Sequence, residues 1–366
     1  MASPQIIFGT ASFKFPKTAW QDAEAVSELL RTLRDLGVTR LDSAACYPPG
    51  DPGRAEELLG ETKDAAGSNT FLIDTKIKPD VLQSGGRGKL TRQAIEASTT
   101  ASLQRLQRPG GGVSNQLPGT SYLRVVETAD PTTPLEEQVQ SFHEQISQGH
   151  CKAWGVSNVP APMLEKMMQL CDQHGWTKPV CYQGQYNLVS RGMENWPLPL
   201  LRAHNMAFNG YHPLAAGFLT GKFIRGEHAG TRLVDDHPYN RRCARQLVGG
   251  GGGLVLMEAM KVFDAGVEAH GLTSTEVAYR WLAVYSTICL LFTPSYSSLS
   301  EGTNVQFDVG VPLVSGRRRR HHHWREQTGT GHRYDRPHPE GPLPDAVVSL
   351  AEKLWEAVKG TRANML

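Results

Sequence analysis

Thr39-Arg-Leu-Asp-Ser-Ala-Ala-Cys-Tyr47 is a short apolar run that ends on a carboxylate and a phenol. A second run of the same kind, Phe71-Leu-Ile-Asp-Thr-Lys76, ends on an ammonium group. Both runs are typical of β-strands that end in polar side chains. If the two strands are parallel neighbours, Asp42, Tyr47 and Lys76 converge at one mouth of the sheet, where loops build active sites.

These three residues predict proton transfer to a carbonyl oxygen. A nearby positive charge favours the phenolate and lowers the pKa of a tyrosine towards neutrality. Asp42 can hold the Lys76 side chain in place, so that Tyr47 is suited to protonating a developing alkoxide. The same three residues could instead have structural roles, as a tyrosine in a turn, an aspartate that caps a helix and a lysine at the surface. The rest of the chain has to distinguish this interpretation from the catalytic one.

The remaining sequence alternates strand-like runs with amphipathic segments of helical length. In the first of these segments Ala25, Leu29, Leu33 and Leu36 fall on one face. The predicted strands are 6–9, 40–42, 71–76, 123–127, 153–157, 180–183 and 207–211. The predicted helices are 23–36, 55–59, 91–106, 135–148, 163–174, 198–204, 254–270 and 273–284. This alternation predicts a parallel α/β fold, which an eighth unit would close into a (β/α)8 TIM barrel.

Length and charge narrow the class of protein. A chain of 366 residues with a formal net charge of +2 can form one large domain or two ordinary ones, and this charge balance argues against nucleic-acid binding. No apolar run is long enough to span a membrane, and the first residues lack the features of a signal peptide. We therefore expect a cytoplasmic protein with no membrane partner. The 6 cysteines have no paired spacing and predict free thiols.

Residues 285–339 break the pattern. Their first part could hold a strand, but the stretch that begins Arg317-Arg-Arg-Arg-His-His-His323 has neither helical nor strand periodicity. A terminal helix follows, with Pro344 in its first turn. We interpret 285–339 as an aberrant or disordered part of a single domain, 1–366, with an irregular eighth unit. The pentaglycine 249–253 is interpreted as a flexible surface loop, and consecutive histidines predict no metal site.

Nine stretches of the chain resemble the aldo-keto reductases, most closely the branch of aflatoxin-aldehyde and succinic-semialdehyde reductases. These stretches are FGTASF, LDSAACY, GRAEELLG, DTKI, DPTTPLEE, AWGVSN, YQGQYN, YHPLAAGFLTGKF and EGPLPDAVV, in the order of the family. The resemblance implies a (β/α)8 barrel that reduces an aldehyde or ketone with NADPH, with secondary metabolism as one setting. Some relatives are homodimers, and the expected partner is a small carbonyl substrate.

The resemblance also implies catalytic roles. Tyr47 would be the general acid, Lys76 its pKa-lowering partner and Asp42 the carboxylate that positions Lys76. At the fourth strand the family has a histidine that donates to the substrate carbonyl oxygen, and alignment of the DPTTP turn places Glu127 there. A carboxylate would repel the developing alkoxide unless it stays protonated. The steroid double-bond reductases of this superfamily carry glutamate at that position, so enone C=C reduction is an alternative chemistry.

Cofactor contacts follow from the same resemblance. Ser157, Asn158 and Gln183 match residues that hydrogen-bond the nicotinamide carboxamide, and Tyr211 matches the aromatic residue that stacks on the nicotinamide. Five further residues match the loop that lies along the cofactor pyrophosphate and the positively charged side chains that this loop supplies. They are Pro213, Leu214, Gly217, Lys222 and Arg232.

Two departures from the family leave other interpretations open. The first departure is Glu127 at the place of the family's histidine. The second is larger, because the eighth strand and the segment that grips the adenosine 2′-phosphate are both missing as written. The main alternative is therefore a barrel that has lost catalysis, with a binding role or from a decayed gene. Frameshifted or mis-spliced translation of residues 109–122 and 300–339 would account for the departures. A role like that of the potassium-channel β-subunits, which share the fold, has no specific support in the sequence.

Overall fold

A closed ring of parallel strands forms the centre of the protein. The computed structural model describes residues 6–16, 18–62, 71–77, 90–107, 121–126, 130–227, 244–245, 247, 251–285, 289–292 and 343–362. The strands are β1 (Ile6–Gly9), β2 (Arg40–Asp42), β3 (Leu72–Ile77), β4 (Ser121–Val126), β5 (Cys151–Ser157), β6 (Cys181–Gln185), β7 (Ala207–Tyr211) and β8 (Cys289–Phe292). They pair in chain order, and β8 closes the ring by pairing with both β7 and β1.

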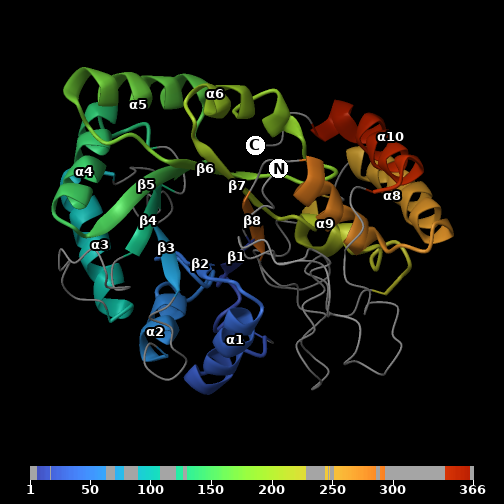
Figure 1. Cartoon of the computed structure of the whole chain (residues 1–366), viewed down its shortest axis with the longest axis horizontal. Helices are drawn as coiled ribbons and strands as arrows, with labels where there is room; N and C mark the ends of the chain where they lie inside the picture. Colours follow the sequence, from blue (N-terminus) through green and yellow to red (C-terminus); the bar gives the residue numbers. More distant parts are fainter. Residues whose placement is uncertain are drawn as a thin grey trace, which may run out of the picture.

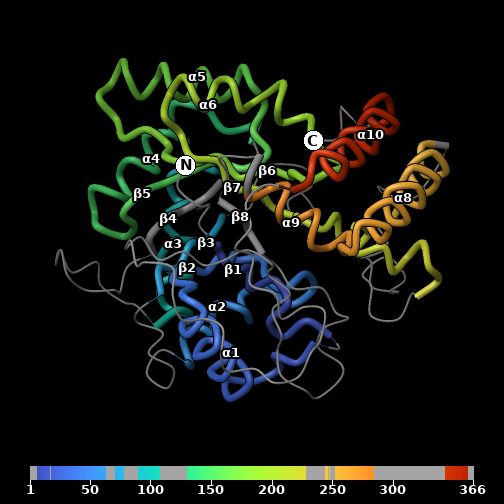
Figure 2. The backbone as a smooth tube through the Cα atoms, turned by 45° about the vertical axis from the view of Figure 1, so that its right-hand side comes forward, coloured from blue at the N-terminus to red at the C-terminus, as the bar shows by residue number. Residues whose placement is uncertain are grey.

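Helices surround this ring (Figure 1). They are α1 (Ala23–Asp35), α2 (Arg54–Glu61), α3 (Arg92–Arg105), α4 (Leu135–Ser147), α5 (Ala161–His174), α6 (Leu198–Ala203), α8 (Gly251–Ala269), α9 (Ser274–Tyr285) and α10 (Asp345–Arg362). Two short 3₁₀ segments, η2 (Gly192–Glu194) and η3 (Ala215–Thr220), lie in the loops after β6 and β7. The C-terminal helix α10 packs beside α8 at one side of the molecule (Figure 2).

The predicted parallel α/β fold is confirmed, with two corrections. The family's eighth strand, which the sequence lacks as written, has a counterpart in β8, which lies in the first part of 285–339, where the sequence allows a strand, and pairs with both β1 and β7. Gly251 to Gly253, expected in a loop, form the first turn of α8. Close packing explains this, because a Cβ at Gly252 would lie 3.2 Å from the Cβ of Thr361 on α10. Apart from β8, the segment 285–339 lies outside the described residues.

Helix α1 shows how local sequence positions the elements. Asp22 caps its start, where the side chain accepts a hydrogen bond of 2.9 Å from the backbone N–H of Ala25. Leu29 and Leu33 are buried as predicted, but Leu36 ends the helix and is 38% exposed. The buried face therefore stops one turn earlier than the sequence pattern indicates.

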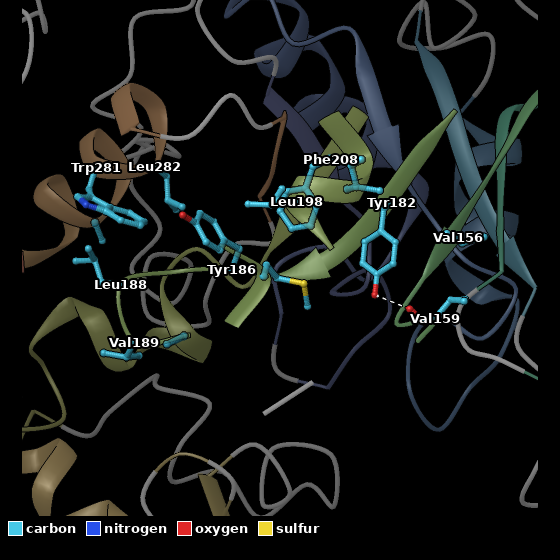
Figure 3. Packing of buried hydrophobic residues seen from close by; sticks show 14 of the residues in the cluster. Val156, Val159, Tyr182, Tyr186, Leu188, Val189, Leu198, Phe208, Trp281 and Leu282 are labelled. Atoms are coloured by element: carbon cyan, nitrogen blue, oxygen red, sulfur yellow. Dashed lines mark hydrogen bonds between the residues drawn. The ribbon is translucent and has the colours of Figure 1, made fainter. Parts of the chain in front are cut away.

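Alternation along the strands separates an apolar outer layer from a polar barrel interior. Tyr182 on β6 points into the hydrophobic layer, where its hydroxyl donates to the Val159 carbonyl at 3.1 Å (Figure 3). Its neighbour Gln183 faces the opposite side of the strand and bonds Asp42 on β2. Polar side chains thus meet inside the ring, which is where the predicted catalytic residues lie.

Gly60 gives a test of the packing between α2 and α3. A Cβ at Gly60 would overlap the backbone carbonyl oxygen of Arg105, which cannot rotate away. Gly60→Ala is expected to lower the free energy of unfolding by about 1–3 kcal/mol. The matched control is Gly360→Ala in α10, where the added Cβ meets no atom within 4 Å. That variant is expected to gain up to about 1 kcal/mol from helix propensity. Equal effects in urea unfolding would contradict this account.

Candidate active site

The structure brings Asp42, Tyr47 and Lys76 together at the carboxyl ends of β2 and β3. The Lys76 ammonium donates to Asp42 Oδ2 at 2.5 Å and to the Ser43 carbonyl at 2.7 Å. It also lies 4.8 Å from the centre of the Tyr47 ring. Asp42 and Lys76 are buried, whereas Tyr47 is half-buried. A buried cation therefore lies against a phenol that keeps access to the barrel mouth.

Gln183 lies closer to the Asp42 carboxylate than the sequence indicates. It is predicted to hold the nicotinamide carboxamide, and in the structure its Nε2 donates to Asp42 Oδ1 at 3.1 Å. Both oxygens of Asp42 are thus engaged, one by Lys76 and the other by Gln183. Gln183 therefore positions the carboxylate of Asp42 together with Lys76.

Three further predicted residues form a hydrogen-bonded chain across the ends of β5 and β7. The Tyr211 hydroxyl donates to Asn158 Oδ1 at 3.0 Å, and Asn158 Nδ2 donates to Ser157 Oγ at 3.0 Å. Asn158 has φ 54°, a left-handed conformation that asparagine tolerates better than most residues. This backbone turns the amide away from the strand direction and towards Tyr211. Their role towards a cofactor stays a prediction.

The loop after β7 has an unusual backbone. Ala215, Ala216 and Gly217 all have positive φ values, of 49°, 57° and 94°. Gly217 is buried, and a Cβ there would meet no described atom within 4 Å. Pro213 and the start of η3 are also buried, and Leu214 packs against the hydrophobic core of the protein.

Lys222 adds a positive charge at the end of this loop. It is half-buried, and within the described part of the chain no carboxylate lies within ion-pair distance of its ammonium. Successive backbone amides in left-handed turns, together with a cation, are typical of sites for anions. Glu127 and Arg232, the two other predicted site residues, lie outside the described residues.

Arg40 and Asp74 are the site residues that sequence reasoning missed. Arg40 Nε donates to Asp74 Oδ2 at 2.8 Å, and this ion pair lies inside the barrel next to Asp42 and Lys76. Burial raises the pKa of Asp74 to about 7, Arg40 opposes this rise, and Asp42 adds to it. The alternation Arg40-Leu-Asp42 and Asp74-Thr-Lys76 could have placed all four charges on one face of the sheet.

Asp74 makes the stability of the fold depend on pH. An acid whose pKa is higher in the folded than in the unfolded chain binds more protons when folded. Its contribution to stability is therefore complete below its ordinary pKa of 3.8 and is lost as pH rises through about 7. Asp74→Asn removes this titration at constant size. Between about pH 5 and about pH 9, the free energy of unfolding is expected to fall more for the wild type than for the variant. If urea unfolding gave the same dependence of unfolding free energy on pH for the wild type and the variant, this prediction would be wrong.

Comparison with known proteins places the chain among reductases. The model of the aldo/keto reductase family matches residues 5–322. Aflatoxin B1 aldehyde reductase member 2 of Mus musculus is 33% identical over 216 residues, which is 58% of this chain and only 54% of that protein. An aldo-keto reductase of Pseudocercospora fijiensis is 26% identical over 337 residues, 90% of this chain and 97% of that protein.

A third relative covers almost the whole chain. Oxidoreductase sirO of Leptosphaeria maculans is 29% identical over 363 residues, which is 98% of this chain and 95% of that protein. The described helices include none that is both long and apolar enough to cross a membrane. Among the described residues, no group of histidine, cysteine, aspartate and glutamate is arranged to hold a metal ion.

Proposed function

Because the chain belongs to the aldo/keto reductase family, we propose that it reduces an aldehyde or ketone to an alcohol with NADPH. The observation that carries this proposal is the buried Lys76 ammonium, which bonds Asp42 and lies 4.8 Å from the centre of the Tyr47 ring. A family member without this arrangement would have no evident acid for the carbonyl oxygen. The description of the mouse relative makes an aldehyde the first carbonyl to test.

In the proposed mechanism, the protein's own residues supply and control one proton. Tyr47 donates its phenolic proton to the carbonyl oxygen as negative charge develops there. Lys76, held by Asp42 and the Ser43 carbonyl, places a positive charge beside the phenol and favours release of that proton. Burial strengthens this effect because little water screens the charge of Lys76.

The residues around the strand ends fit a nicotinamide cofactor. Ser157, Asn158 and Tyr211 present a chain of hydroxyl and amide groups suited to a carboxamide and an aromatic ring. The left-handed backbone of residues 215–217 and the cation of Lys222 suit the charged pyrophosphate. When bound, NADPH would supply the hydride that the carbonyl carbon receives. We assign the same residues to NADPH rather than NADH by resemblance to the family alone.

Fluorescence titration of the purified protein with NADPH, and with NADH alongside, tests this proposal. We expect NADPH-selective binding, followed by oxidation of NADPH when a small aldehyde is added. No binding by a folded protein would overturn the proposal. Binding without turnover of aldehydes, ketones or enones would favour the catalytically impaired barrel, and turnover of enones alone would favour C=C reduction through Glu127.

The setting of the enzyme is also a proposal. We assign it to the cytoplasm and to secondary metabolism, as a single domain over residues 1–366 with a homodimer as its assembly. Cys46, Cys151, Cys171 and Cys181 are not in disulfides. Light scattering during size-exclusion chromatography measures the assembly, and a monomer would contradict that part.

A further inference from the structure

Four charged side chains form a continuous row inside the barrel. Asp42 on β2 is in register with Asp74 on β3, so the two carboxylates face each other across neighbouring strands. Arg40 bonds Asp74 at 2.8 Å, and Lys76 bonds Asp42 at 2.5 Å. The row therefore consists of two ion pairs, Arg40 with Asp74 and Asp42 with Lys76, whose carboxylates stand on residues in register.

The two facing carboxylates have different surroundings. Both oxygens of Asp42 accept hydrogen bonds, from Lys76 and Gln183. Asp74 bonds Arg40 through Oδ2, whereas its buried Oδ1 has no hydrogen-bond partner among the residues that the structure describes. Protonation of a carboxylate oxygen costs the least free energy where that oxygen accepts no hydrogen bond, because no donor then has to be displaced. Asp74 is therefore the member of the pair that takes up a proton. The raised pKa of Asp74 agrees with this geometry.

We propose, on the basis of the proposed reductase function, that Asp74 is a positioning residue whose protonation sets how strongly Lys76 favours proton release from Tyr47. When Asp74 is neutral, the Lys76 charge is opposed by Asp42 alone. When Asp74 is ionised, a second negative charge lies nearby and weakens the positive potential at the phenol. The proton-transfer step is then faster below neutral pH than above it, by roughly three- to tenfold.

The charged groups next to Asp74 come from two strands. On β2 the charged neighbours are Arg40 and Asp42, and on β3 the charged neighbour is Lys76. On β4 the residue in register with Asp74 is Leu123, which has no ionisable group.

Infrared spectroscopy tests the protonation of Asp74 without any need for activity. The carbonyl stretch of one buried carboxylic acid should disappear from the wild-type spectrum as pH rises through about 7. Asp74→Asn should lack this change. Arg40→Gln removes the cation that opposes the rise in pKa, so the change should move to higher pH. A wild-type spectrum without the change, or a change that survives Asp74→Asn, would overturn the proposal.

Single-turnover reduction of an aldehyde at saturating NADPH tests the link to the reaction. The wild-type rate should fall through neutral pH, Asp74→Asn should be flat, and Arg40→Gln should shift the fall upwards. If Asp74 had only a structural role, the two substitutions would not change the pH at which the rate falls. If Asp74→Asn does not fold, the upward shift of that pH in Arg40→Gln tests the proposal by itself.

The outcomes separate the two proposals. A wild-type fall that persists unchanged in both variants would overturn the role of Asp74 and leave the reductase function intact. No turnover by the wild type at any pH would overturn the reductase function, and this inference with it.

Discussion

Tyr47→Phe is expected to lower kcat for aldehyde reduction by about 10²- to 10⁴-fold, the contribution of a positioned general acid. The substitution removes the phenolic proton and keeps the ring that lies against the Lys76 ammonium. Because Tyr47 is half-buried and the change is isosteric, NADPH affinity and the free energy of unfolding should change little. Single-turnover kinetics with saturating NADPH measures the loss directly.

Tyr182→Phe is the matched control for this variant. It removes a hydroxyl that donates to the Val159 carbonyl in the hydrophobic layer, away from the barrel interior (Figure 3). Its expected effect is a loss of about 1 kcal/mol of stability with unchanged kcat. If Tyr47→Phe turned over as fast as Tyr182→Phe, Tyr47 would not be the acid.

Lys76→Met is expected to lower the free energy of unfolding by about 3–5 kcal/mol, the cost of leaving a buried charge without its partner. Lys76 is 1% exposed and Asp42 is 2% exposed, so water cannot take the place of the ammonium. Of the four charges in the row, two carboxylates, Asp42 and Asp74, and one cation, Arg40, would then remain. Urea unfolding followed by tryptophan fluorescence measures the change.

The double variant Asp42→Asn/Lys76→Met separates a lost contact from an uncompensated charge. With both charges removed, much of the stability lost in Lys76→Met should return. Lys261→Met is the surface control, because Lys261 pairs with Glu258 on the exposed side of α8. Its expected effect is below about 0.5 kcal/mol. A double variant less stable than Lys76→Met would contradict the uncompensated-charge explanation.

Local sequence was sufficient for the order of strands and helices and for the convergence of Asp42, Tyr47 and Lys76. Hydrophobic periodicity and polar strand ends depend on a few neighbouring residues, and parallel neighbours necessarily bring their carboxyl ends to one edge. The same reasoning left β8 undecided, because the short run CLLF is identified as the eighth strand by its pairing with β1 and β7. It was wrong at Gly251 to Gly253, which form the first turn of α8, with Gly252 close to Thr361 on α10.

The sequence by itself determined which residues could carry the chemistry, since residue type sets the available protons and charges. Only the tertiary structure decided that Asp42 faces Asp74 and that Gln183 reaches Asp42 from 141 positions away in the chain. Strand register and ring closure bring together residues that no local pattern connects. Burial inside the ring then changes the free energy of their charged forms relative to their neutral forms. The pKa of Asp74 near 7 is such a property, because it comes from desolvation and from neighbouring charges on another strand.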